Sequence, residues 1–209
     1  MTSSLAHSEA AEWDPGLEAE QLRELGVERC VGKPPIVLEI GFGRAELIMG
    51  LAAQSPEQSF LGVEVSRKRV FKAARRILRG GLRNVRIVHS SGEYVLERAL
   101  PAECVGECWI NCPDPWPKKR HFRRRLIQPD YLRSLARVLV GKGLLHISTD
   151  HRGYAEWIAD ALRDMADFEN LHAPDAWSNA RPDRSETAYE AEWREEGREI
   201  AYFDYRKRG

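Results

Sequence analysis

The chain has 209 residues, of which 32 are Lys or Arg and 32 are Asp or Glu, so its formal net charge is zero. A hydrophobic fraction of 43% at this length is enough for the core of one domain and excludes wholesale disorder. A mean hydropathy of −0.50, no signal-peptide pattern in residues 1–12 and only four cysteines predict a cytoplasmic protein with no membrane contact and no disulfide scaffold.

Residues 1–33 are predicted to form a polar leader, and we expect this leader to contain one short helix near 17–25. Residues 34–209 are expected to form a single domain. Short runs rich in Val, Ile and aromatic residues, bounded by Gly and Pro, predict strands. In chain order these runs cover 36–40, 59–65, 85–89, 105–111, 144–148, 168–172 and 198–205.

Segments with helical periodicity separate most of these strands. Ser66 is expected to cap the second helix, and Gly141-Lys142-Gly143 to end the fourth before the next strand begins. Strands that alternate with helices predict an α/β fold with a largely parallel sheet. The predicted helices cover 45–53, 66–78, 93–100, 130–139 and 154–165.

The zero net charge conceals two basic segments. No acid lies between Val65 and Gly92, where nine residues are Lys or Arg, and none lies between Pro115 and Pro129, where six are. The acids gather in the first thirty residues and in the last third of the chain. Because a surface potential depends on how charges are grouped locally, a chain with zero net charge can still bind a polyanionic partner. The alternative is that the first segment is a solvated helix face balanced by acidic neighbours in the fold.

Gly41-Phe42-Gly43 lies between a predicted strand and a helix, as in the βα turns that bind nucleotides. Two carboxylates accompany the turn: Glu39 lies two residues before it, and Glu64 lies 21 residues after Gly43, near the ~20 expected for an acid that holds ribose. Glu46 stands where a dinucleotide-binding turn has its third glycine, which disfavours a pyrophosphate at this helix.

These features favour S-adenosylmethionine (SAM) over NAD as the ligand of the turn. SAM has no phosphate, but it has an amine, a sulfonium cation and ribose hydroxyls, which suit Glu39 and Glu64. The alternative is structural: Glu39 caps a neighbouring loop, and Glu64 is a solvated strand end.

The stretch from Asn111 to His121, NCPDPWPKKRH, is the most unusual in the chain. It leaves the fourth predicted strand at the edge where open α/β sheets bind ligands. Three prolines stiffen the loop, so Asp114 and Trp116 are held at low entropic cost. The aromatic face and the neighbouring cations suit bases and phosphates. The alternative is a stiff connection with a solvated basic face.

Five motifs together resemble the bacterial tRNA (guanine-N7-)-methyltransferase family. They are LEIGFG at 38–43, GVEV at 62–65, PDPWPKKRH at 113–121, Ser148-Thr149-Asp150 and Thr187-Ala188-Tyr189-Glu190. The resemblance extends over about residues 36–205. It implies a Rossmann-like SAM-dependent methyltransferase fold, with a mostly parallel seven-stranded sheet and helices on both faces. It also implies SAM as cofactor and a guanine in the variable loop of tRNA as target. From the spacing of its cysteines and histidines, the chain is expected to bind no metal.

The resemblance assigns roles to the residues at matching positions. Asp114 matches the acid assigned to catalysis and to contact with SAM. The residues expected to bind the cofactor are Glu39, Gly41, Gly43, Glu64, Ser91 and Asp114. Those expected to bind the substrate are Lys118, Asp150, Thr187, Tyr189 and Glu190. The cations expected to contact tRNA phosphates are Lys119, Arg120, Arg123, Arg124 and Arg125.

One position departs from the family pattern. The family has Asp-Ala after the third strand, near the adenine, whereas this chain has Ser90-Ser91-Gly92, with Ser91 in the Asp position. A hydroxyl accepts an adenine N–H more weakly than a carboxylate does. Glu93 is the alternative acceptor.

The chemistry of guanine N7 sets the expected mechanism. N7 carries a lone pair and no proton, so no base is needed and positioning is expected to supply most of the acceleration. Asp114 is expected to stabilise the positive charge on the purine by accepting hydrogen bonds from N1–H and the exocyclic amine. Because N7 faces the deep, narrow groove of A-form RNA, the base must be unstacked. Trp116 either stacks on that base or packs under the loop.

Two other functions stay open from the sequence. One is a SAM-dependent methyltransferase of a small molecule or a protein, and the other is a noncatalytic RNA-binding protein on the same fold. Cys104, Cys108 and Cys112 lack the CxxC pairs of metal sites and are expected to pack in the core. The oligomeric state and the preferred tRNA species are not indicated.

Overall fold

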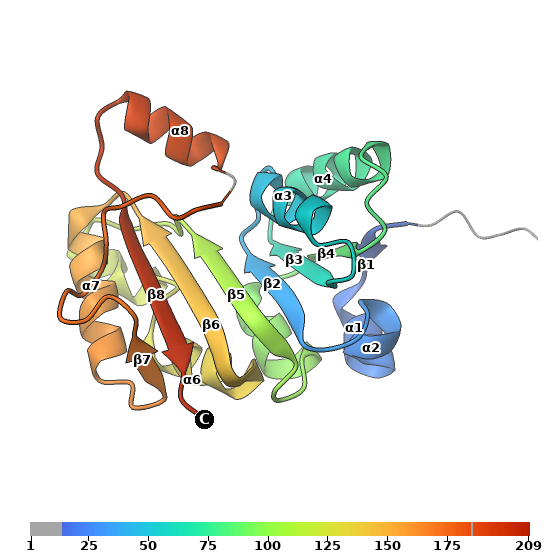
Figure 1. The fold of residues 1–209 in the computed structure, drawn as a ribbon, viewed down its shortest axis with the longest axis horizontal. Helices are drawn as coiled ribbons and strands as arrows, with labels where there is room; N and C mark the ends of the chain where they lie inside the picture. The colour runs from blue at the N-terminus through green and yellow to red at the C-terminus, as the bar shows by residue number, and fades with distance from the viewer. Residues whose placement is uncertain (1–13, 185) are drawn as a thin grey trace, which may run out of the picture.

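The computed structural model describes residues 14–184 and 186–209, which build an eight-stranded sheet with helices against both faces (Figure 1). The strand order is β1-β4-β3-β2-β5-β6-β8-β7, in which only β8 runs antiparallel to its two neighbours. The predicted α/β fold with a mostly parallel sheet is therefore confirmed. The strands are β1 (Gly16–Leu17), β2 (Ile36–Ile40), β3 (Phe60–Glu64), β4 (Val85–His89), β5 (Val105–Asn111), β6 (Leu139–Thr149), β7 (Phe168–Asn170) and β8 (Ala201–Lys207).

The helices divide between the two faces of the sheet. On one face α3 and α4 pack against β3 and β4, and on the other α6 and α7 pack against β6. None of the helices in the described part of the chain has the length and apolar character that a bilayer span requires. The helical elements are α1 (Ala19–Leu25), α2 (Val27–Cys30), α3 (Glu46–Gln54), α4 (Arg67–Arg79), α5 (Gly92–Tyr94), η1 (Val95–Ala99), η2 (Lys119–Arg124), α6 (Pro129–Val138), α7 (Arg152–Arg163) and α8 (Ala188–Glu195).

The sheet has eight strands rather than the predicted seven, because the chain before the first predicted strand adds β1. Gly16 and Leu17 pair in parallel with Ile87 and Val88 of β4. A strand of two residues has no alternating apolar pattern, so the sequence does not reveal it. Just beyond it, Leu22 of α1 is fully buried in the main core cluster, so this part of the leader packs on the domain.

Strand β6 begins earlier than predicted and directly follows α6 at Leu139. The segment Gly141-Lys142-Gly143, predicted to separate the two elements, lies inside the strand. A Cβ at Gly143 would come within 2.9 Å of the Val140 carbonyl oxygen and 3.1 Å of the Gly106 one. Glycine is therefore needed here by close packing of backbone rather than by a helix end.

The central strands are buried on both faces, as their unbroken apolar runs predict. Every residue of β2 and β3 is buried, including Glu39 and Glu64. Because β2, β3, β5 and β6 are parallel, their carboxyl ends meet at one edge of the sheet. The loops that leave this edge carry most of the predicted site residues.

Candidate functional site

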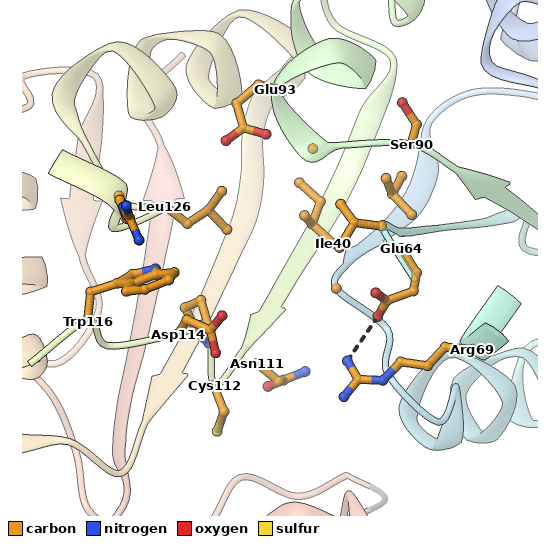
Figure 2. Close-up of a pocket in the computed structure, with 16 residues that line it drawn as sticks. Ile40, Glu64, Arg69, Ser90, Glu93, Asn111, Cys112, Asp114, Trp116 and Leu126 are labelled. Carbon is orange, nitrogen blue, oxygen red and sulfur yellow. Dashed lines mark ion pairs between the residues drawn. The ribbon is translucent and has the colours of Figure 1, made fainter. Parts of the chain in front are cut away.

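Two adjoining cavities, of about 290 and 380 Å³, open at the carboxyl ends of β2, β3 and β5. Glu64, Glu93 and Trp116 line the first cavity (Figure 2), whereas Glu39 and Tyr189 line the second. The two share one wall, so a ligand in one cavity lies beside a ligand in the other. The residues that line both cavities are Gly41, Arg69, Asn111, Cys112, Pro113 and Asp114.

The glycine turn after β2 is tied to the end of β3. Gly41 and Gly43 have φ values of +76° and +54°, in the left-handed region that favours glycine. The Gly43 N–H donates a hydrogen bond to Glu64 Oε2 at 3.0 Å. The structure thus brings these three predicted cofactor-binding residues together at the cavity walls.

Glu39 places a buried carboxylate in the second cavity. Its side chain is 3% exposed and accepts the Ile48 N–H of α3 at 3.1 Å. Burial raises the pKa of Glu39 to about 7, although the Ile48 hydrogen bond and the charge of Arg184 act in the opposite direction. The residue therefore accepts a backbone N–H of helix α3 rather than capping a loop, as the structural alternative supposed. It also offers a desolvated acceptor for a cationic group.

Glu64 is not the solvated strand end of the structural alternative, because it is only 3% exposed. Besides Gly43, it accepts the Ser66 N–H at 2.9 Å, and Arg69 lies 3.5 Å from its Oε2 (Figure 2). The Ser66 hydroxyl makes none of the capping bonds predicted for it. Arg69 also hydrogen-bonds the Tyr189 hydroxyl at 3.3 Å, which connects Glu64 to α8.

The proline-rich loop holds Asp114 between two strained residues. Cys112 and Trp116 are non-glycine residues with φ values of +49° and +42°, a conformation that persists only where its surroundings enforce it. The Cys112 N–H donates to the Ser148 carbonyl at 2.9 Å, which fixes one end of the loop to β6. Asp114 is exposed at the wall of both cavities, the first of which Figure 2 shows, and no described residue donates a hydrogen bond to its carboxylate.

Arg125 does not occupy the position that a phosphate contact requires, which corrects the prediction made for it. Its side chain is 3% exposed, and its Nε donates to the Pro115 carbonyl at 2.9 Å. Its guanidinium lies 3.7 Å from the centre of the Phe122 ring and 5.0 Å from those of Tyr154 and Trp157. Arg125 therefore fixes the other end of the proline-rich loop from inside the protein.

The remaining predicted phosphate contacts lie on the surface beside the first cavity. Arg124 and Trp116 line that cavity, with the guanidinium 5.0 Å from the ring centre. The His121 ring meets Trp116 edge-on, with the ring centroids 5.6 Å apart. Trp116 thus has cationic and aromatic neighbours at the cavity rim. The predicted cations that are exposed here but line neither cavity are Lys118, Lys119, Arg120 and Arg123.

The Thr187–Glu190 motif is engaged within the protein. The Thr187 hydroxyl accepts the Glu190 N–H at 3.2 Å, and Glu190 Oε2 accepts the Thr187 N–H at 2.8 Å, so the pair caps α8. Glu190 is 1% exposed and binds both terminal nitrogens of Arg184, at 2.7 and 2.9 Å. Thr187 and Tyr189 line the second cavity, whereas Glu190 lies behind them. Glu190 therefore supports the site from inside.

Asp150 lines the second cavity but is paired. Its Oδ2 accepts a hydrogen bond from Arg198 at 2.8 Å, and Arg198 lines the same cavity. The Arg198 guanidinium also contacts Glu196 at 2.8 Å. A substrate that binds Asp150 must therefore share it with Arg198.

Ser91 is turned away from the predicted cofactor contact. Its hydroxyl accepts the Tyr94 N–H at 3.2 Å, which caps the short helix α5. The flanking residues Ser90 and Glu93 line the first cavity instead. A Cβ at Gly92 would lie 2.5 Å from the Tyr131 hydroxyl oxygen, so this glycine lets the start of α5 approach the core closely.

The cysteine series divides between core and site. Cys104 and Cys108 belong to the main core cluster, whereas Cys112 lines both cavities. Burial raises the pKa of the Cys112 thiol to about 12, so it stays protonated. Within residues 14–184 and 186–209, no group of three or more His, Cys, Asp or Glu side chains is arranged to hold a metal ion.

Sequence reasoning missed several residues at the cavities, among them three polar side chains of the walls. Arg69 and Asn111 line both cavities, and Arg198 lines the second. Arg69 is one of many cations in a basic helix, so no spacing rule singles it out. The position of Asn111 at the end of a central strand was the available signal, since such positions meet at the binding edge.

Comparisons with known proteins agree with this geometry. A family model described as a putative methyltransferase matches residues 33–203. The tRNA (guanine-N(7)-)-methyltransferase of Halorhodospira halophila is 40% identical over 174 residues, covering 83% of this chain and 75% of the relative. That of Alkalilimnicola ehrlichii is 38% identical over 185 residues, covering 88% and 78%.

Solved structures support the fold. The 16S rRNA methyltransferase KamB superposes with a TM-score of 0.57 at 18% identity, covering 91% of this chain and 92% of that one. The tRNA (m1A58) methyltransferase TrmI from Aquifex aeolicus gives a TM-score of 0.53 at 12% identity, covering 83% and 62%. The chain therefore has a Rossmann-like methyltransferase fold, as predicted.

Proposed function

Since this chain belongs to the tRNA (guanine-N(7)-)-methyltransferase family, we propose that it transfers a methyl group from SAM to N7 of a guanine in the variable loop of tRNA. The observation that carries the proposal is Asp114, an exposed carboxylate with no hydrogen-bond donor among the described residues, at the wall shared by the two cavities. The cytoplasm is the proposed location, because the substrate is tRNA.

The carboxylates of Glu39 and Glu64 fit the amine and ribose hydroxyls of SAM better than they fit a phosphate-bearing cofactor, although arginines also line both cavities. Glu39 and Glu64 are both buried carboxylates, and an anion beside them would be repelled. We assign Glu39 to the amine of SAM and Glu64 to the ribose hydroxyls. When bound, SAM supplies a methyl group made electrophilic by the adjacent sulfonium. For the adenine we assign Glu93 in place of Ser91, because Glu93 lines the first cavity and the Ser91 hydroxyl is already used as a cap.

The reaction requires little acid–base chemistry from the protein. Guanine N7 carries a lone pair and no proton, so no residue has to act as a base before it attacks. Positive charge develops on the purine as N7 is alkylated, which makes N1–H and the exocyclic amine stronger donors. Asp114 accepts those donors in the proposed complex and stabilises the transition state more than the ground state. The strained loop supplies the fixed orientation.

The tRNA is held from the basic side of the first cavity. Arg124 lies at the cavity rim, and Lys118 to Arg123 extend the positive charge outward, where phosphates of the variable loop can bind. The target guanine must leave its stack to reach Asp114. The ring of Trp116 lies at the rim of the first cavity, and this position supports a role in stacking on the unstacked guanine.

The direct test is nucleoside analysis of unmodified tRNA incubated with the purified protein and SAM. We expect 7-methylguanosine at one position in the variable loop. Methyl transfer only to a small molecule or a protein would favour a methyltransferase with another substrate. RNA binding without any SAM binding in calorimetry would favour a noncatalytic RNA-binding protein.

A further inference from the structure

Outside both cavities, helix α4 presents a row of cations to solvent. Lys68, Lys72, Arg75 and Arg79 are spaced i, i+4, i+7 and i+11, so they lie along one side of the helix, and all four are exposed. At 1.5 Å per residue this row is about 16 Å long. We call these four residues the α4 stripe. The opposite side of the helix is buried against the sheet.

The stripe is not neutralised by the fold. Among residues 14–184 and 186–209, the one ion pair of α4 joins Arg69 to Glu64, and it lies off the stripe. The first turn of the helix has no acid, so Lys68 there opposes the helix dipole, whereas Arg79 lies in the last turn, where a cation is favourable. Like charges four residues apart also repel each other. An arrangement that destabilises the free helix in this way is expected where a polyanion supplies the missing charge.

Apolar side chains flank the stripe. Phe71 is 62% exposed and Leu78 is 46% exposed, and Val65, just before the helix, is 68% exposed. The Arg75 guanidinium lies 5.0 Å from the centre of the Phe71 ring. Cations interleaved with exposed aromatic and apolar groups are typical of surfaces that bind RNA, because phosphates meet the cations and bases or riboses meet the apolar groups.

The stripe is continuous with the candidate site. Arg69, on the first turns of α4, lines both cavities and hydrogen-bonds Tyr189 of α8 at 3.3 Å. From there the helix runs away from the cavities toward Arg79. Figure 1 shows α4 beside α3, on the side of the molecule that lies away from β8. An RNA seated in the cavities therefore has a basic track leading from their rim.

We propose that the α4 stripe binds phosphates of the substrate tRNA outside the loop that carries the target guanine. The choice of RNA as occupant rests on the proposed function and on the charge of the stripe. In this arrangement residues 118–124 hold the target loop, and the stripe holds a neighbouring helical stem through its backbone, without reading its sequence. The stripe then selects for a folded tRNA over a short single-stranded segment with the same target base.

The test measures equilibrium binding of unmodified tRNA to the full chain, without methyl transfer, by fluorescence anisotropy at several salt concentrations. The variant is Lys72→Gln/Arg75→Gln. The matched control is Arg133→Gln/Arg163→Gln, which removes the same charge from exposed helical positions of α6 and α7 on the other face of the sheet. Calorimetry of SAM binding and thermal melting accompany each variant.

We expect the stripe variant to bind tRNA at least tenfold more weakly and the control to stay within twofold of wild type. The slope of log K against log salt should fall in magnitude by between one and two, since each lost phosphate contact removes ~0.7–0.9. SAM affinity and melting temperature should not change. Equal tRNA affinity in wild type and stripe variant, or equal weakening in both variants, would overturn the proposal.

Failure of the proposed function gives a different pattern. If wild-type protein forms no 7-methylguanosine but the stripe variant still loses tRNA affinity, then the reaction assignment is wrong and the stripe is an RNA-binding surface. If 7-methylguanosine forms and the stripe variant has an unchanged KM for tRNA, then the function stands and the stripe proposal is wrong.

Discussion

Gly43 and Glu64, 21 residues apart in the chain, are joined by a 3.0 Å hydrogen bond from the Gly43 backbone N–H to Glu64 Oε2. The bond makes the glycine turn and the carboxylate one unit. Glu64 Oε1 in turn accepts the Ser66 N–H, so the carboxylate is held from two sides. Oε1 retains a further lone pair, whereas Arg69 already lies 3.5 Å from Oε2, so ribose hydroxyls can share the carboxylate with the backbone mainly through Oε1.

Replacing Glu64 with Gln tests this unit. The amide has one acceptor oxygen, so it can satisfy only one of the two backbone donors of Gly43 and Ser66. We expect SAM to bind at least tenfold more weakly in calorimetry, and the fold to lose about 1–3 kcal/mol, the cost of an unsatisfied buried donor. Glu97→Gln, at an exposed position of η1, is the control. SAM affinity within twofold of wild type would contradict the assignment of Glu64.

The raised pKa of Glu39 predicts a specific pH dependence of the free energy of unfolding. Its pKa is raised from 4.5 to about 7 in the folded protein because of burial. Between these pH values the folded state binds more protons than the unfolded state, so the free energy of unfolding falls as the pH rises through this window. Each pKa unit corresponds to about 1.4 kcal/mol.

The variant Glu39→Gln removes this titration and keeps an acceptor for the Ile48 N–H. We expect it to melt at a higher temperature than wild type at pH 8, with the difference much smaller at pH 5, and to lose SAM binding. Melting curves at both pH values check the first expectation, and calorimetry checks the second. A wild-type advantage at pH 8 would show that the buried charge is stabilised in the free protein.

Arg125 is expected to act through the proline-rich loop. Arg125→Lys keeps the charge but loses the planar group that contacts Phe122 and the Nε that donates to Pro115. We expect a loss of about 2–4 kcal/mol in unfolding free energy, together with a lower kcat. Arg123→Lys, at an exposed position nearby, is the control and should leave the free energy of unfolding unchanged. If Arg125→Lys weakened only tRNA binding and left the melting temperature unchanged, the result would support the original prediction that Arg125 contacts a phosphate directly.

Variants of Glu190 and Thr187 distinguish a residue that supports the site from inside the protein from one that can contact the substrate. Glu190→Gln leaves the buried Arg184 guanidinium with a neutral partner in place of a carboxylate. We therefore expect a loss of about 3–5 kcal/mol in the free energy of unfolding. Thr187→Ala loses the helix cap, with an expected stability cost of about 1 kcal/mol, and it also removes a side chain that lines the second cavity. Chemical denaturation of both variants measures the difference. Loss of activity in Glu190→Gln at unchanged stability would instead indicate direct contact with substrate.

Much of the fold could be predicted from the sequence because it depends on local patterns. The apolar runs of β2 to β5 and the glycine turn have signals in single short windows. The eighth strand has none, because β1 is two residues long and is defined by its pairing with β4. Gly143 was misread for a related reason, since its packing against Gly106 joins residues that are distant in the chain.

The site was predicted as a set of residue types, but the sequence does not state which of them face the cavities. Glu39 and Glu64 lie at strand ends and Asp114 lies in the loop that follows β5, where the fold class fixes their location, and the structure brings all three to the cavity walls. Arg124 and Arg125 are adjacent and chemically identical, yet one lies at the cavity rim and the other is buried. That difference arises from tertiary packing, which a run of cations does not encode.

The most direct measurement of the central claim is single-turnover methyl transfer to tRNA by Asp114→Ala, with SAM and tRNA both saturating. Because Asp114 has no described hydrogen-bond donor and is exposed, its removal should leave the fold and the melting temperature intact. We predict a rate of 7-methylguanosine formation at least 100-fold below wild type, with SAM affinity reduced far less. A rate within threefold of wild type would contradict the account.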